Sequence, residues 1–169
     1  VYANIAQQAD LDAVIHLGDY YYEEGSKGSA IEGREIVPDI ETYTLDEYRE
    51  RHALFKSDVD LQEAHRQHPF ICVWDDHEIA DNTWKHGAHR HDENEHGPYA
   101  DRKAAALQSY DEWMPLRTSA DGDIEKIYRK FEYGDLMELI MIDARLVGRD
   151  QEVSSFNSDG NLSDMCEVK

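Results

Sequence analysis

Basic side chains are scarce in this sequence, which has 17 Lys and Arg residues against 37 Asp and Glu residues and a formal net charge of −20. A nucleic-acid-binding surface needs clustered positive charge, so the composition argues against that class of protein. An acidic chain of this kind fits cation binding, high solubility or an origin in a salty environment. A generally solvated acidic surface accounts for most of these charges.

Cysteine and long apolar runs are also scarce. The two cysteines, Cys72 and Cys166, provide neither a disulfide framework nor the spacing of a metal-binding motif. Cys72 lies in an apolar run and is predicted to be a small core residue, whereas the role of Cys166 is open. The sequence contains no stretch that predicts a membrane span and no signal peptide. Because it starts without Met and ends in a polar stretch, we expect a piece of a larger protein.

The most informative stretch is a short apolar run that ends in ionisable side chains. Residues 70–74, FICVW, predict a buried strand, which continues directly into Asp75, Asp76, His77 and Glu78. Four such groups in a row are costly if they are buried without partners. In open α/β sheets, ligands bind beyond the carboxyl ends of the strands. We therefore expect this strand to deliver carboxylate and imidazole groups to a polar site.

Two further apolar runs end in the same way. Residues 12–17 predict a strand that leads to Asp19, and residues 139–142 predict a strand that ends at Asp143. Carboxylates gathered at one edge repel each other unless a cation or a shared proton compensates. A hard cation is the simplest explanation for the pattern.

The order of predicted elements favours a single α/β domain over residues 1–150, followed by a polar, loosely ordered segment at 151–169. A strand, two helices and a second strand form a βαβ pattern, which implies parallel neighbours. Helices are expected from Thr44, where Thr44 and Glu47 match a capping box, and over 59–65 and 99–114. A hairpin is expected over 127–142, and long loops over 24–43 and 79–98.

Five residues are candidates for site chemistry. Asp19 and Asp76 offer oxygen ligands to a hard cation, although an isolated Asp more often caps a turn or helix. His77 offers a metal ligand or a proton donor to a leaving-group oxygen. Tyr22 is a core residue or a ligand for trivalent iron. Arg145 could hold a phosphate, and ion pairing with Asp143 or Asp150 is an equal alternative.

Four histidines, His86, His89, His91 and His96, lie in the predicted loop 79–98. No strand or helix is expected there to fix a ligand geometry. We expect adventitious transition-metal binding in preference to a dedicated site.

Four segments together resemble the alkaline phosphatase D-like (PhoD-like) metallophosphatases: HLGDYYYEEG (16–25), the stretch ending in PFICVWDDHEIADN (45–82), RKAAALQSYDEWMPLR (102–117) and MIDARLVGRD (141–150). The resemblance implies a calcineurin-like αββα sandwich, of which this chain would form a central part. It implies an exported enzyme, periplasmic or secreted, that hydrolyses phosphate monoesters and diesters with Fe³⁺ and Ca²⁺ as cofactors.

The resemblance also implies roles for single residues. Asp19 matches the family's bridging aspartate, Tyr22 its iron-binding tyrosine and Asp76 a further metal ligand. His77 matches the histidine that contacts the phosphate or leaving group, and Asn82 lies where trailing polar residues approach the substrate. The family's iron-binding cysteine would lie upstream of the Asp19 strand, and its downstream GD-x-H motif is missing here. These residues alone therefore do not assemble the full metal constellation.

The sequence thus predicts a phosphoric ester hydrolase that uses metal-activated water, a fragment of which could be inactive by itself. One alternative is a different metal-dependent esterase, such as a phospholipase- or phytase-like variant of the same scaffold. Another is a non-catalytic acidic domain that binds Ca²⁺ or a partner.

Overall fold

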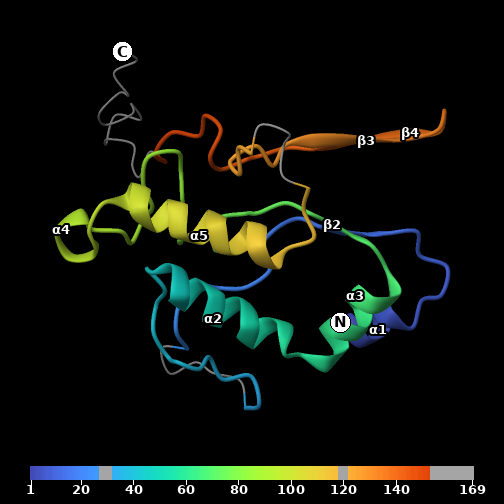
Figure 1. Ribbon diagram of the computed structural model, residues 1–169, viewed down its shortest axis with the longest axis horizontal. Helices are drawn as coiled ribbons and strands as arrows, with labels where there is room; N and C mark the ends of the chain where they lie inside the picture. The colour runs from blue at the N-terminus through green and yellow to red at the C-terminus, as the bar shows by residue number, and fades with distance from the viewer. Residues whose placement is uncertain (27–31, 118–121, 153–169) are drawn as a thin grey trace, which may run out of the picture.

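The computed structural model describes residues 1–26, 32–117 and 122–152 (Figure 1). Cys166 and nearly all of the predicted polar segment 151–169 lie outside the described residues. None of the helices in the described part of the chain is long and apolar enough to cross a membrane. The elements in chain order are α1 (Tyr2–Ala6), β1 (Val14–His16), α2 (Leu45–Lys56), α3 (Val59–Gln67), β2 (Phe70–Cys72), α4 (Glu93–His96), α5 (Tyr99–Trp113), β3 (Arg129–Tyr133) and β4 (Met137–Met141).

The centre of the molecule is a parallel pair formed by β1 and β2, in which Ile15 aligns with Ile71. The parallel arrangement confirms the prediction from the βαβ pattern. Every residue of β2 is buried, as expected for its continuous apolar run, and Cys72 is a fully buried core residue as predicted. The amide of Val73 donates to the carbonyl of His16, so the strand pairing continues one residue beyond β2.

Helices α2 and α5 lie side by side (Figure 1). The predicted capping box starts α2: the Thr44 hydroxyl accepts from the amide of Glu47, and the Glu47 carboxylate accepts from the amide of Thr44. Inside the packed helices, the His52 ring is fully buried and stacks on Trp113. The Tyr48 hydroxyl donates to the carbonyl of Ile79, which ties α2 to the segment that follows β2.

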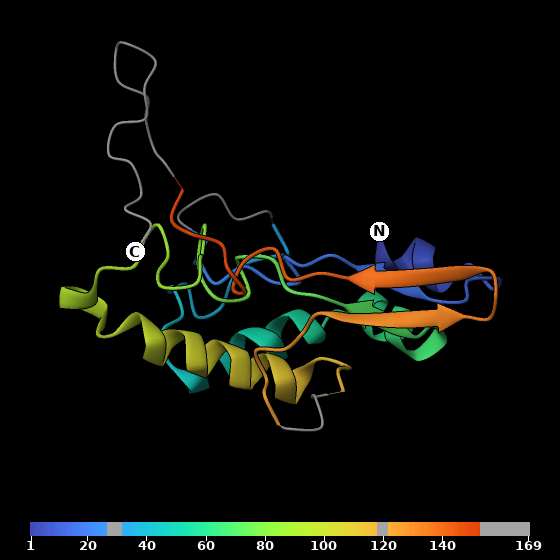
Figure 2. The same cartoon turned by 90° about the horizontal axis from the view of Figure 1, so that it is seen from above.

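Strands β3 and β4 form the predicted antiparallel hairpin, which extends as a separate two-stranded ribbon (Figure 2). Among the described residues it does not join the β1–β2 sheet, so the third predicted strand does not end at the same sheet edge as the other two. The chain is of mixed α/β type, and its described strands form two small sheets. The predicted loop 79–98 also contains a short helix, α4, whose N-cap Asp92 accepts from the amide of Asn94.

Candidate metal centre

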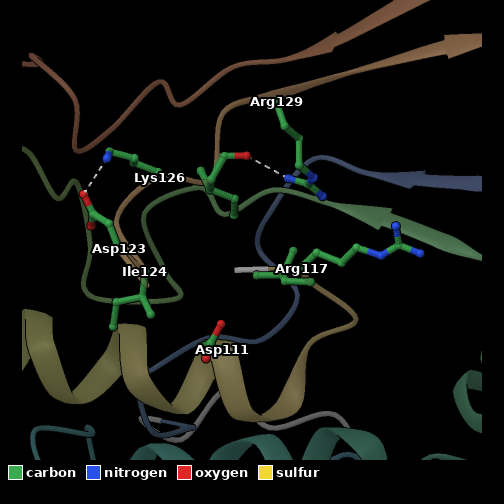
Figure 3. Close-up of a pocket in the computed structure, with 8 residues that line it drawn as sticks. Asp111, Arg117, Asp123, Ile124, Lys126 and Arg129 are labelled. Atoms are coloured by element: carbon green, nitrogen blue, oxygen red, sulfur yellow. Dashed lines mark hydrogen bonds and ion pairs between the residues drawn. The ribbon is translucent and has the colours of Figure 1, made fainter. Parts of the chain in front are cut away.

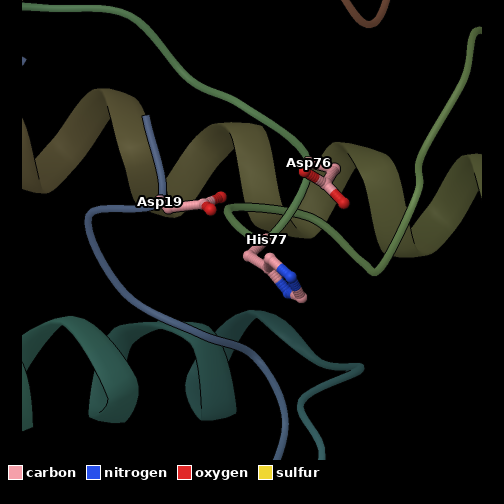
Figure 4. Close-up of side chains that lie close together, drawn as sticks. All are labelled: Asp19, Asp76 and His77. Atoms are coloured by element: carbon pink, nitrogen blue, oxygen red, sulfur yellow. The ribbon is translucent and has the colours of Figure 1, made fainter. Parts of the chain in front are cut away.

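The side chains of Asp19, Asp76 and His77 meet where the chain leaves β1 and β2 (Figure 4). One potential ligand atom from each residue lies within 4.8 Å of the other two. The carboxyl ends of parallel strands lie at the same edge of a sheet. This arrangement brings Asp19 and Asp76 together although they are 57 positions apart in the sequence. The prediction that these two strand ends meet is therefore confirmed.

Asp19 is held in an unusual backbone conformation. Its φ of 52° is in the left-handed region, and Gly18 before it has a φ of 105°. The Asp19 Oδ2 atom accepts from the Tyr22 hydroxyl at 3.1 Å, while Oδ1 is buried without a hydrogen-bond partner. A buried carboxylate oxygen without a partner is costly. The two carboxylates that meet here, those of Asp19 and Asp76, are the kind of oxygen donor that a hard cation prefers.

Asp76 is buried, and each of its oxygens has a protein partner. Oδ2 accepts from the amide of Asn82 at 2.6 Å, and Oδ1 lies 2.9 Å from Nη2 of Arg145. Arg145 Nε also donates to the carboxylate of Asp75. Arg145 thus pairs with Asp75 and Asp76, and not with Asp143 or Asp150 as the sequence had suggested. The reason is that the segment after β4 returns to the site. Burial raises the pKa of the Asp76 carboxyl despite this cation.

His77 is paired with a buried carboxylate. Its Nδ1 lies 2.6 Å from Oε2 of Glu23, a fully buried residue whose other oxygen accepts from the amide of Asp81. The Tyr22 ring packs on the imidazole with a centroid separation of 4.1 Å. Burial lowers the pKa of His77, but the hydrogen bond and charge of Glu23, with the nearby aspartates, outweigh it and raise this pKa to about 9. The imidazole is therefore protonated at neutral pH.

Glu78, the last residue of the acidic run, points into the protein and connects the two strand ends. Its carboxylate accepts from the amide of Tyr20 at 2.5 Å and from the amide of Asp75 at 2.8 Å. Burial raises the pKa of Glu78 to about 7, although these amide hydrogen bonds act in the opposite direction.

Tyr22 is half-exposed, and its hydroxyl reaches the Asp19 carboxylate. Burial and the charge of Asp19 raise the pKa of Tyr22 to about 12, which favours the neutral phenol. Arg51, which is buried in α2, donates to the carbonyls of Tyr22, Glu24 and Ile40 and so fixes the segment that carries Tyr22 and Glu23.

Sequence reasoning named most of this site but omitted Glu23. The residue was visible in the acidic segment after β1, yet no periodicity relates it to His77, which is 54 positions away. Asp143 does not join the group of three: its Oδ1 accepts from the amides of Arg145 and Leu146 and shapes the turn after β4. In the histidine-rich loop, Nε2 of His91 is hydrogen-bonded to the carbonyl of Gly97.

Two hollows lie near these elements. A groove of about 650 Å³ borders Asp19 and Tyr22 and continues along apolar side chains such as Ile15 and Phe55. A smaller hollow lies beside α5 (Figure 3), and the residues labelled there are Asp111, Arg117, Asp123, Ile124, Lys126 and Arg129. Within it, Lys126 pairs with Asp123, and Arg129 donates to the backbone carbonyls of Ile127 and Cys72.

A parallel strand pair with carboxylates and an imidazole at its carboxyl edge is an arrangement suited to a metal-assisted phosphatase. The sequence model of the PhoD-like phosphatase family matches residues 1–167, and the chain belongs to this family. It is 38% identical over 164 residues to alkaline phosphatase D of Bacillus subtilis (strain 168), which covers 95% of this chain and 27% of that protein. A solved structure described as "Structure of PhoD" matches with a TM-score of 0.76 and 36% identity over 89% of this chain and 29% of that one. The chain therefore spans between a quarter and a third of the length of these relatives.

Proposed function

We propose that this chain supplies the central part of the active site of a metal-dependent phosphoric ester hydrolase that acts on phosphate monoesters and diesters. The observation that carries the proposal is the convergence of Asp19, Asp76 and His77, together with a buried Asp19 oxygen that has no hydrogen-bond partner. The membership of the PhoD-like phosphatase family supports it.

In this proposal, Asp19, Asp76 and Tyr22 hold the metal ions, with Fe³⁺ and Ca²⁺ as the expected pair. When bound, such ions neutralise phosphoryl charge and activate water for attack. Tyr22 would hold a hard trivalent ion as its phenolate, with the phenol proton released to water, because the charge of the ion would stabilise the phenolate.

The remaining residues act on the phosphate ester itself. His77, protonated and oriented by Glu23, donates its other N–H to the leaving-group or phosphoryl oxygen. Arg145 already lies against Asp76, and its planar guanidinium suits a phosphate that displaces part of this ion pair. The backbone amide of Asn82 donates to Asp76, which places this residue beside the site, and in the proposal its side chain contacts the substrate. The groove beside Asp19 and Tyr22 gives a substrate access to this edge.

We further propose that the complete domain is a calcineurin-like αββα sandwich and that the protein works in the periplasm or outside the cell. The small β1–β2 and β3–β4 sheets are compatible with the edges of two larger sheets. The match to the PhoD structure supports this arrangement.

The proposal is tested with the whole protein, by hydrolysis of p-nitrophenyl phosphate and bis(p-nitrophenyl) phosphate with elemental analysis for iron and calcium. We expect Asp76→Asn to lower turnover at least about 100-fold and to reduce the bound metal. Asp135→Asn, in the exposed hairpin turn, is the matched control and should leave both unchanged. Full turnover by the Asp76→Asn protein would refute the assignment, as would wild-type protein that is active without metal.

A further inference from the structure

We propose that Glu78 is a positioning residue that sets the separation of Asp19 and Asp76. The metal-binding consequence of this inference rests on the proposed function, whereas the geometric consequence does not. The inference is drawn from the contacts of a single buried carboxylate and from the backbone of the two loops that it joins.

Glu78 reaches the peptide groups that flank both candidate ligands. One of its oxygens accepts from the amide of Tyr20, directly after Asp19, and the other accepts from the amide of Asp75, directly before Asp76. A third bond comes from the Tyr21 hydroxyl, which donates to the backbone carbonyl of Glu78 at 2.8 Å. The Glu78 side chain thus connects the two loops, because it bonds to the peptide that follows Asp19 and to the peptide that precedes Asp76.

The location of these bonds explains why the connection affects the ligands. Asp19 has a left-handed φ of 52°, a conformation that costs a non-glycine residue free energy unless its surroundings hold it. The hydrogen bond to the next amide, that of Tyr20, fixes the peptide that follows this conformation. Because Glu78 is only 1% exposed, water cannot replace either amide bond.

If Glu78 had a purely structural role, its substitution would change only the stability of the fold. Glu47 provides a control for that possibility. The Glu47 carboxylate also accepts from two backbone amides, those of Tyr43 and Thr44, but it lies in the capping box of α2. Glu47→Gln and Glu78→Gln make the same chemical change, in which an NH₂ group replaces one carboxylate oxygen. Both amides at Glu47 bond to the single oxygen Oε2, which a glutamine oxygen can replace, whereas Glu78 uses both oxygens and loses one amide bond. A geometric effect on the aspartates should appear only with Glu78→Gln.

The geometric test needs no metal. Asp19→Cys and Asp76→Cys are combined in the whole protein with Cys166→Ser and with Ser at every cysteine outside residues 1–169. The two thiols are then bridged by dibromobimane, a short reagent that becomes fluorescent on bridging. Cys72 is fully buried and does not compete. We expect the rate of bridging to fall several-fold when Glu78→Gln is added and to stay unchanged when Glu47→Gln is added. Equal rates in all three backgrounds would overturn the inference.

The metal test uses Mn²⁺ titration of the native-ligand protein, followed by electron paramagnetic resonance. Loss of an outer-shell partner typically weakens metal binding by about 10–100-fold, which is the fall expected for Glu78→Gln and not for Glu47→Gln. If Glu78→Gln does not fold, Tyr21→Phe, which removes only the hydroxyl bond to Glu78, should reduce bridging and Mn²⁺ affinity in the same direction. Equal Mn²⁺ affinity in the Glu78 and Glu47 variants would overturn the inference and leave the proposed function standing. Absence of Mn²⁺ binding by the wild type, with slower bridging in Glu78→Gln, would instead count against the proposed function alone.

Discussion

Replacing Gly18 with Ala should separate the two strand ends that form the candidate site. A Cβ atom at this position would lie 2.1 Å from the amide nitrogen of Asp75 and 2.6 Å from the carbonyl carbon of Trp74. Ordinary contact begins at 3.4 Å, so the two backbones would have to move apart by about 1.3 Å. Backbone atoms cannot move aside in the way that the end of a flexible side chain can. The pairing of His16 with Val73, at 3.0 Å, lies directly beside this contact and would weaken.

The expected cost can be assembled from three contributions. The left-handed φ of 105° costs Ala about 1–3 kcal/mol, the overpacking about 1–3 kcal/mol and the weakened strand bond about 1 kcal/mol. Gly18→Ala should therefore lower the free energy of unfolding by at least about 3 kcal/mol, measured by urea denaturation. It should also weaken Mn²⁺ binding, because Asp19 and Asp76 move apart with their backbones.

Gly148 provides the matched control. Its φ is 116°, close to that of Gly18, but a Cβ atom there would meet nothing within 4 Å. Gly148→Ala should therefore show only the conformational cost of about 1–3 kcal/mol. If the two substitutions destabilise the protein equally and leave Mn²⁺ binding equal, the close approach of the two strand ends does not constrain the site.

Two further predictions concern buried polar groups in α2. Burial and the charge of Lys56 lower the pKa of His52 to about 3, so the folded protein holds this ring neutral while the unfolded chain protonates it near pH 6.5. The stability from His52 is complete above pH 6.5 and is lost as pH falls towards 3, by about 1.4 kcal/mol per pH unit. Since neither ring nitrogen has a hydrogen-bond partner, His52→Phe should keep the fold and make unfolding free energy less steep between pH 4 and 6; an unchanged slope would refute this. Tyr48→Phe should cost about 1–3 kcal/mol in urea unfolding, because it leaves the carbonyl of Ile79 and Nε of Arg102 without a buried partner. A cost no larger than that of Tyr133→Phe in the exposed hairpin would contradict that expectation.

Features of the fold that depend on neighbouring residues could be predicted from the amino-acid sequence. The apolar run at Phe70, the capping box at Thr44 and the βαβ order predicted the strands, the start of α2 and the parallel pairing, and each was found. The convergence of Asp19 and Asp76 followed from this order, because strand direction alone places their ends at one edge. Such features follow from periodicity and local hydrogen bonding, which can be read along the chain.

The pairing of the ionisable groups in the site could not be predicted from the sequence and follows from the folded arrangement. Glu23 pairs with His77 across 54 positions of sequence, and Arg145 pairs with Asp75 and Asp76 across 70 and 69 positions. These pairs depend on the paths of irregular segments, which carry no repeating pattern and are fixed by contacts such as those of the buried Arg51. The placement of the β3–β4 hairpin outside the β1–β2 sheet was decided in the same way. An alternation of apolar and polar residues predicts a strand and its buried face, but it does not predict which strand lies next to it in the sheet.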